Sequence, residues 1–560
     1  MFRKTPKEKQ LGIFSHTSSL LSGKLRNYYD EPYSWHNIFR NQVTTRINEA
    51  TFSKLYSKGM GAPNASVRVM VAMMIIKESQ GWSDAQLFEH SRYNLLIRSA
   101  LGLLNMDDAL PTESTYYLLR KHVVEHEKTT GENLIEKTFA DVTKEQAAEF
   151  EVSGKSIRMD SKLLGSNIAW YSRYELVHET LRLFYKKLKP FIDTLQIDKD
   201  IIGQLDAVLK EEGNKVVYHH NRDELKTRLQ HLGILIDKVL QITELQRIAH
   251  YQTLCRVFKE QFQVDESLLV ITRAKEEITT NSVQSPHDTD CHYRNKDGNQ
   301  VKGYGINVTE SCDKDELHLI SDVDVRPVSA ADNGFLEEGI SQSQEVFTGE
   351  TQNVHADGAY HSLDNQAYCK GKEINLYLSA IQGAKGRFDL MPGINNELTV
   401  TDTETGEIIP ATKLEAKETW RIRTTNGLRY FTQKQIDACL LRKHLENLPA
   451  QITNVRNNVE ASIFQLGYHY PNDKSRYRGL MKHKMWANIR CLWVNFVRIL
   501  KYVKQNCPLP GEVCQRTTDN EKTGLKSFVL ALNFASEVFI GLYIILFYNV
   551  FKKKFISANF

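Results

Sequence analysis

The amino-acid sequence predicts a mixed α/β protein whose N-terminal part is helical. Residues 36–150 place apolar side chains at helical spacing. Alternating apolar and polar residues, which indicate strands, begin at 156–162 and resume after residue 302. Within 374–431, Thr-Gly and Asn-Gly pairs separate short apolar runs, as in β-hairpins. Together these patterns favour a sheet domain that follows a helical domain.

The composition is that of an ordinary globular protein. Of 560 residues, 41% are hydrophobic and 25% are charged, with 30 Gly and 13 Pro. These values exclude a collagenous, low-complexity or largely disordered chain. The formal net charge of +4 is too small to indicate a polyanionic partner, so an argument for such a partner must come from local charge.

Cysteines and terminal segments indicate a cytoplasmic protein. No two of the eight cysteines have the close spacing of a zinc knuckle, so we expect reduced thiols. The N-terminus lacks the apolar core of a secretion signal. Residues 527–551 have the length of a membrane span, but Asn533, Glu537 and Asn549 interrupt them, so we expect a packed C-terminal element and no membrane contact.

The helical domain, residues 36–150, follows an N-terminal arm at 1–35. Residues 67–76 are apolar on most sides of a helix and predict a buried one, while Ser83 and Gln86 form a predicted capping box. Another helix is expected after Thr112. Four basic residues could place a helix of this cluster in a DNA groove, although most such clusters are structural: Arg92, Arg98, Arg120 and Lys121.

The first strand is predicted around 156–162, with Asp160 inside it. From 172 to 262 the helical pattern returns, and Leu225 to Val239 carry apolar residues at alternating spacings of four and three. We expect a helical hairpin inserted into the sheet domain, with coiled-coil dimerisation as the alternative.

Further strands are predicted at 302–308, 317–325 and 353–357, and the β-rich stretch 374–431 contains two hairpins. The apolar spacing of 452–466 then predicts an amphipathic helix, and residues 481–503 predict another.

Three acids occupy unusual places in this pattern: Asp160 within a strand, Asp357 at a strand end, and Glu460 beside the apolar stripe of a late helix. Singly, each is more often a solvated or capping carboxylate. Together, three carboxylates could hold two Mg²⁺ ions, leaving one positive charge to meet a phosphodiester. Such paired ions activate an attacking hydroxyl and stabilise the leaving oxygen. Without metal the acids repel, so we expect at least one raised pKa.

Three motifs around these acids resemble those of bacterial insertion-sequence transposases of the DDE type. They are MDSKLLGSNIA (159–169), HADGAY (355–360) and RNNVE (456–460). Beyond them, RYRGL (476–480) and NFVR (495–498) are similar to the family's C-terminal pattern. The resemblance extends from about residue 36 to 503.

The resemblance implies a ribonuclease-H-like core with a mixed sheet and flanking helices. Asp160, Asp357 and Glu460 would be catalytic and would bind two Mg²⁺ or Mn²⁺ ions. The activity implied is cleavage at transposon ends and transfer of the 3′ hydroxyls into target DNA. The partners implied are double-stranded DNA, as inverted-repeat ends and target, and a second copy in a homodimer.

The same resemblance divides the chain. The helical domain would bind transposon ends, and the catalytic domain would span 151–505, with the β-rich stretch 374–431 where related transposases carry an insertion. The helical insertion at 172–262 comes from the residue pattern alone, and the resemblance assigns it no role. A hydrophobic extension, 506–560, would follow.

The chain departs from the family pattern around Glu460. Some relatives carry a Tyr seven residues before this Glu, an Arg four before it and a Lys seven after it, all contacting DNA. Here Arg456 is kept, but Thr453 and Gly467 replace the other two. Between 442 and 504 basic residues outnumber acidic ones by twelve to three, so phosphate contacts are expected nearby. The DNA-binding candidates are Arg456, Lys474, Arg476, Arg478 and Lys482.

Two further residues have weaker predictions. Trp420 could support a flipped base, although a packed hairpin tryptophan is the more common case. His355 shares its side of a strand with Asp357, and we expect it to pack rather than to transfer protons. Two other functions stay open: a transposase-derived DNA-binding protein that does not cut, and a structure-specific nuclease with the same core.

Overall fold

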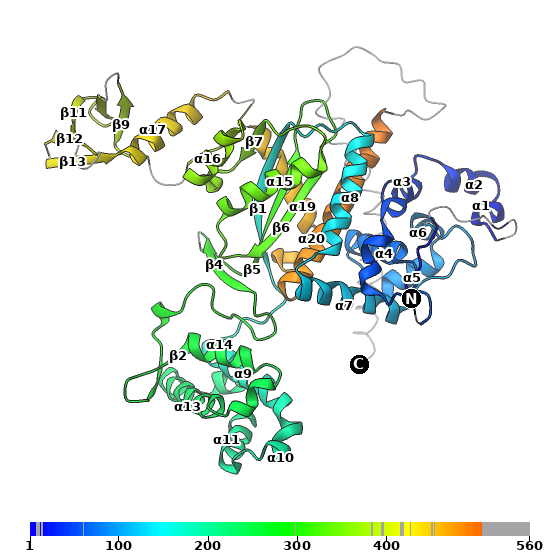
Figure 1. Cartoon of the computed structure of the whole chain (residues 1–560), viewed down its shortest axis with the longest axis horizontal. Coiled ribbons are helices and arrows are strands. Elements are labelled where there is room, and N and C mark those ends of the chain that lie inside the picture. Colours follow the sequence, from blue (N-terminus) through cyan, green and yellow to red (C-terminus); the bar gives the residue numbers. More distant parts are fainter. Residues whose placement is uncertain are drawn as a thin grey trace, which may run out of the picture. The chain divides into compact units, whose positions relative to one another are not determined.

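The computed structural model describes residues 1–506 apart from 7–11, 13–14, 60, 297, 382–384, 394–396, 415–418, 426, 450–451 and 453. The fold mixes helices and sheets, as the sequence predicts (Figure 1). The apolar segment 527–551 lies outside the described residues. No helix of the described part is long and apolar enough to cross a membrane. The six described cysteines are all free thiols, as expected.

Short helices make up the N-terminal part. Ser83 and Gln86 form the predicted capping box, and every residue of the apolar helix α4 except Gln80 is buried. Thr112 caps the helix expected after it. The helices are α1 (Thr17–Leu20), α2 (Gly23–Asp30), α3 (Trp35–Gln42), η1 (Thr44–Arg46), η2 (Glu49–Leu55), α4 (Val67–Gln80), α5 (Asp84–Tyr93), α6 (Leu95–Ala100), α7 (Glu113–Thr130) and α8 (Leu134–Glu149).

A six-stranded mixed sheet follows. Its strands are β1 (Ser156–Gly165), β4 (His292–Lys296), β5 (Asn299–Ser311), β6 (Ile320–Pro327), β7 (Asn353–Ala356) and β8 (Asn375–Leu378). β5 pairs antiparallel with β1, β4 and β6, whereas β7 lies parallel to both β1 and β8. β1 is therefore an inner strand, with β5 on one side and β7 on the other.

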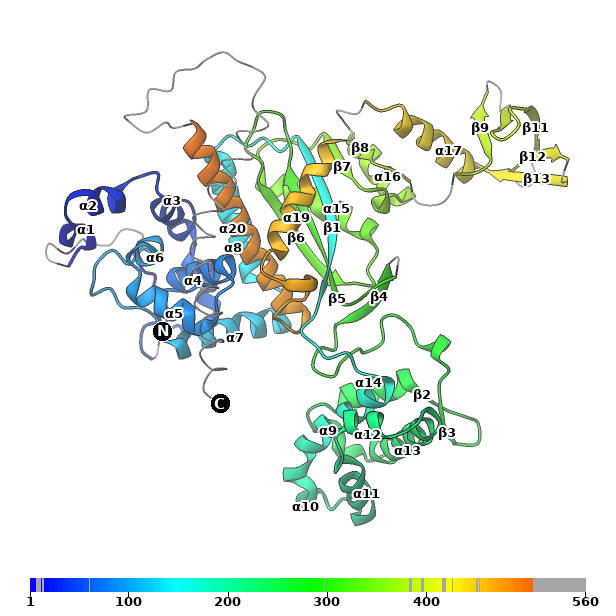
Figure 2. The same ribbon diagram turned by 180° about the vertical axis from the view of Figure 1, so that it is seen from behind.

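Helices cover both faces of this sheet. Figures 1 and 2 show α15 (Leu336–Val346) on one face, and α19 (Val459–Gly467) and α20 (Leu480–Asn506) on the other. Met159 packs against Gly339 of α15, and α19 contacts β1. Because successive side chains of a strand point to opposite faces, Asp160 points away from α15 and toward α19.

The helical insertion is larger than the predicted hairpin, which is therefore wrong. Six α-helices occupy 172–262 and share a hydrophobic core of their own. The apolar stripe of α13 packs in this core, against the other helices of the insertion. Leu229, Leu232, Ile236 and Val239 are buried there, which also excludes the coiled-coil alternative for this stripe. The helices are α9 (Arg173–Leu188), α10 (Ile192–Leu195), α11 (Lys199–Leu209), α12 (Gly213–His219), α13 (Arg222–Leu240) and α14 (Tyr251–Gln261).

The β-rich stretch divides between two sheets. β8 pairs with β7 in the central sheet, so the separate sheet begins only at β9. That second sheet has the order β13-β12-β11-β10-β9, and the two predicted hairpins form its turns. Its elements are β9 (Phe388–Pro392), β10 (Leu398–Asp402), β11 (Ile408–Leu414), β12 (Thr419–Thr424) and β13 (Gly427–Thr432), followed by α17 (Gln433–Glu446).

The helix that carries Glu460 starts later than its apolar spacing predicts. A 3₁₀ turn, η10 (Asn454–Asn458), comes first, and the α-helix α19 begins at Val459.

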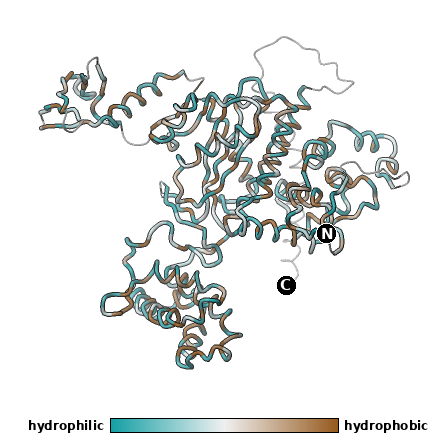
Figure 3. The backbone as a smooth tube through the Cα atoms, in the orientation of Figure 1, coloured by the Kyte–Doolittle hydropathy of each residue, from teal (hydrophilic) through white to brown (hydrophobic). Residues whose placement is uncertain are grey.

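The described residues form three hydrophobic cores, one in the central body and one in each insertion. Figure 3 shows hydrophobic residues along the chain in all three regions.

Candidate active site

The three predicted acids surround one guanidinium. Arg456 Nη2 lies 3.0 Å from Asp160 Oδ2 and 3.9 Å from Glu460 Oε1, while its Nη1 lies 4.0 Å from Asp357 Oδ1. Residues that are remote in sequence thus converge at one point on the α19 face of the sheet.

Backbone and hydroxyl donors orient the two aspartates. The Ser161 amide donates to Asp160 Oδ1 at 2.8 Å, which leaves Oδ2 facing Arg456. Asp357 follows the end of β7, and its Oδ1 accepts from the Gly358 amide at 2.7 Å and from Ser379 Oγ at 2.9 Å. A Cβ at Gly358 would lie 2.5 Å from the carbonyl oxygen of Ala380. Only glycine therefore lets these two segments approach so closely.

A buried ion cluster anchors the helix that carries Glu460. Glu310 on β5 is fully buried and accepts from Ser462 Oγ at 2.6 Å, two residues after Glu460. Its carboxylate also pairs with Arg158 on β1 at 2.6 Å and with Arg498 on α20 at 2.7 Å. Burial opposes ionisation of Glu310, but the two guanidiniums outweigh it and hold its pKa below the usual value. The cluster joins β1, β5, α19 and α20 beneath the acids.

The pKa of Asp160 is raised, as expected for a metal-free site, but for a different main reason. Burial of this side chain, which is 12% exposed, is the largest cause; the nearby Arg456 opposes it, and repulsion from Asp357 adds the smallest of the contributions. Dehydration of the carboxylate, more than crowding of like charges, makes its ionisation costly here.

The donor set suits a divalent cation, because it consists of carboxylate oxygens, which Mg²⁺ prefers. The arrangement is nevertheless centred on Arg456: among the described residues, no three His, Cys, Asp or Glu side chains form a group that could hold a metal ion. Glu460, whose side chain is 65% exposed, is the most open of the three acids.

The other predicted DNA-binding residues lie apart from this guanidinium. Lys474 Nζ donates to the carbonyl of Ile168, and Arg478 Nε donates to that of Asn167, so both contact the loop that follows β1. Arg476 donates to the carbonyl of Trp82 at 3.3 Å. All three side chains, and that of Lys482 on α20, are exposed.

Lys162 is a basic residue that the sequence reasoning missed. Its Nζ lies 3.1 Å from the point where a Cβ at Gly467 would stand, and it pairs with Asp473 at 2.5 Å. In the DDE pattern that the sequence resembles, some proteins carry a Lys at the position of Gly467, and the Lys162 ammonium from β1 lies beside this position. The signal was present in the sequence, because Lys162 is two residues after Asp160 and shares its strand face. Thr453, at the other departing position, lies outside the described residues.

Several weaker predictions have clear outcomes. Trp420 is buried in the core of the second sheet, which contradicts a role as an open stacking platform. His355 is buried and stacks on Tyr377 with ring centroids 5.0 Å apart, and burial lowers its pKa to about 4, so it packs as expected. Arg98 is also buried and donates to the carbonyls of Asn105, Met106 and Asp108. A groove contact from Arg98 is therefore wrong, because its guanidinium is used inside the domain.

The other three basic residues that were candidates for a DNA groove are in ion pairs. Arg92 pairs with Glu113, Arg120 with Asp84, and Lys121 with Glu125.

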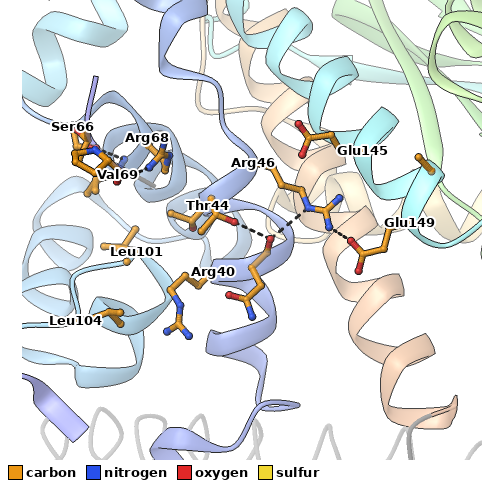
Figure 4. A pocket seen from close by; sticks show the side chains of 16 residues that line it. Arg40, Thr44, Arg46, Ser66, Arg68, Val69, Leu101, Leu104, Glu145 and Glu149 are labelled. Atoms are coloured by element: carbon orange, nitrogen blue, oxygen red, sulfur yellow. Dashed lines mark hydrogen bonds and ion pairs between the residues drawn. The ribbon is translucent and has the colours of Figure 1, made fainter. Parts of the chain in front are cut away.

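A cavity of about 940 Å³ lies in the helical domain, and none of the three acids lines it. Figure 4 shows Arg40, Arg46 and Arg68 on its wall, with Arg46 directed at Glu149, to which it is ion-paired. The volume of a cavity therefore does not identify the candidate active site of this chain.

Comparison with known proteins gives one finding. Residues 32–122 match the family described as a transposase domain (DUF772). The match covers helices of the N-terminal part and supports a transposase. No curated protein and no solved structure matches the chain.

Proposed function

Because residues 32–122 match a transposase domain, we propose that the protein is a DDE transposase that cuts DNA at transposon ends and joins the freed 3′ ends to target DNA. The observation that carries this proposal is the meeting of Asp160, Asp357 and Glu460 around Arg456. A mixed sheet with helices on both faces supports a ribonuclease-H-like core. The substrates would be double-stranded inverted-repeat ends and target DNA, handled in the cytoplasm by a homodimer.

Asp160, Asp357 and Glu460 would hold two Mg²⁺ or Mn²⁺ ions once the Arg456 guanidinium, which they surround in this structure, moves from between them. Bound there, the ions would supply Lewis-acid activation of an attacking hydroxyl and stabilisation of the leaving oxygen. The protein's own contribution is orientation: Ser161, Gly358 and Ser379 fix the aspartates by hydrogen bonds. Arg456 offsets the negative charge of the acids, and a guanidinium of this kind also suits a phosphate oxygen.

Substitution of the acids tests the proposal. We expect Asp160→Asn and Glu460→Gln each to reduce Mg²⁺-dependent cleavage of DNA carrying the element's ends at least about a hundredfold, because a metal ligand is lost. Binding of the same DNA should persist. Asp364→Asn, an exposed acid on α16 (Leu363–Gly371), is the matched control.

The readouts also separate the alternative functions. Cleavage and joining of pre-cut ends to plasmid are measured in parallel. If the wild-type protein binds but never cuts, the non-cutting DNA-binding protein is the correct assignment. If it cuts but never joins ends to plasmid, it is a nuclease.

A further inference from the structure

A second cavity, of about 480 Å³, lies beside β1, next to the acid site. Lys162 lines it and lies two residues after Asp160 on the same strand face, about 7 Å along the strand. We call this cavity the Trp170 groove and define it by Lys162, Trp170, Arg294, Lys296, Lys302 and Lys474.

The groove is strongly basic. Five basic side chains and two acidic ones, Asp332 and Asp473, line it. Each acid already faces a cation of the groove, since Asp473 pairs with Lys162 at 2.5 Å and Asp332 lies 3.8 Å from Arg294. In the described part of the chain, Lys296, Lys302 and Lys474 have no ion-pair partner. Such a surplus attracts phosphate groups.

Trp170 is unusual in this setting because it is 54% exposed. The ammonium of Lys302 lies 5.0 Å from the centre of its ring. Burial lowers the pKa of that lysine, which fits a cation held close against the groove wall. An aromatic plane beside cations is what proteins use to stack the bases of unpaired strands while holding their phosphates.

We propose that the Trp170 groove binds an unpaired DNA strand end, with one base stacked on Trp170 and phosphates held by Lys296, Lys302 and Lys474. Bases inside a duplex have both faces covered by their neighbours, so only an unpaired base can stack on a side chain. The proposal rests on the proposed function, since the groove would hold the strand that enters or leaves the acid site.

Two kinds of probe test the groove. Anisotropy is measured, without divalent ions, for a fluorescein-labelled duplex with an unpaired thymidine tail and for the same duplex fully paired. We expect Trp170→Ala to weaken binding of the tailed DNA about tenfold or more, the value of one stacked base, and to leave paired DNA unchanged. Trp170→Phe should retain most of the affinity. Tyr218→Ala, an exposed aromatic in the helical insertion, is the control.

A charge variant and a competitor sharpen the result. Lys302→Gln should reduce the salt dependence of tailed-DNA binding by about one phosphate contact. Equal binding by Trp170→Ala and wild type, or an equal loss for tailed and paired DNA, would overturn the proposal. Competition by free thymidine monophosphate as strong as by the tailed strand would also overturn it, because the groove would then be a mononucleotide site.

The outcome is independent of cleavage. If the protein never cuts DNA but binds the tailed strand through Trp170, the groove is a strand-binding site and the transposase proposal is wrong. If the protein cuts DNA but Trp170→Ala does not change tail binding, the transposase proposal holds and the groove proposal is wrong.

Discussion

Arg456 gathers three carboxylates that would otherwise repel one another. Arg456 precedes Glu460 by four residues. This spacing, which can be read from the sequence, places the two side chains on one side of the segment that leads into α19. The approach of Arg456 to Asp160 and Asp357 was not visible, because it depends on how η10 packs against β1 and β7. Arg456 was predicted from the sequence only as a DNA contact, and its contacts with all three acids are seen only in the structure.

Gly358 controls how closely Asp357 approaches the segment after β8. We expect Gly358→Ala to destabilise the protein by about 1–3 kcal/mol, because the added Cβ meets the Ala380 carbonyl. It should also reduce DNA cleavage, since Asp357 would lose its bond from Ser379. Urea unfolding and cleavage rate measure the two effects. Gly371→Ala, where a Cβ meets nothing within 4 Å, should change neither.

Glu127 on α7 makes stability depend on pH. Its side chain is buried, and burial is the main cause that raises its pKa to about 7, with Glu136 adding to the shift and Lys484 opposing it. A carboxyl with a raised folded-state pKa stabilises the fold fully below its unfolded pKa, and this contribution is lost as pH rises toward 7. We expect Glu127→Gln to be more stable than wild type by about 1–3 kcal/mol near pH 8.

That advantage should shrink toward about pH 5, where the wild-type carboxyl is protonated in the folded state. Urea titrations at both values measure it. The exposed Glu125→Gln on the same helix should behave as wild type at both, and a pH-independent effect of Glu127→Gln would contradict the assignment.

At the scale of elements, the sequence predicted most helices and strands but not which sheet each strand joins. The capping box at Ser83 and the apolar α4 form as predicted because their signals are local. β8 was placed with the wrong sheet, since its pairing with β7 is a contact that no local pattern encodes. Glu310 was not predicted for the same reason, because its structural role depends on ion pairs with two arginines that are far away in sequence.

The buried Glu310 cluster holds α19 and α20 against the central sheet. We expect Glu310→Gln to lower the free energy of unfolding by about 3–5 kcal/mol, because the buried Arg158 and the partly buried Arg498 would be left without a counterion. Adding Arg498→Met should recover part of the loss. Glu350→Gln, at an exposed position, is the matched control. A neutral effect of Glu310→Gln in urea unfolding would show that the cluster does not secure α19.

At the scale of the whole molecule, each insertion has its own hydrophobic core, and the central body has a third. The chain leaves the body for the helical insertion after Ser166 and returns near Asp288, and these two side chains are hydrogen-bonded. Tyr304 on β5 holds the same aspartate at 2.5 Å. These hydrogen bonds thus join the exit and the return of the chain beside the end of β1.

The helical insertion is thus closed at its base, where it joins the central body. The helices of the insertion could therefore change in length or sequence while the central sheet keeps its register, because their buried side chains pack in a core of their own; of the residues near the attachment points, Ile168 packs in the central core and should be kept. Variation in length between similar chains should therefore concentrate at this junction and spare β1.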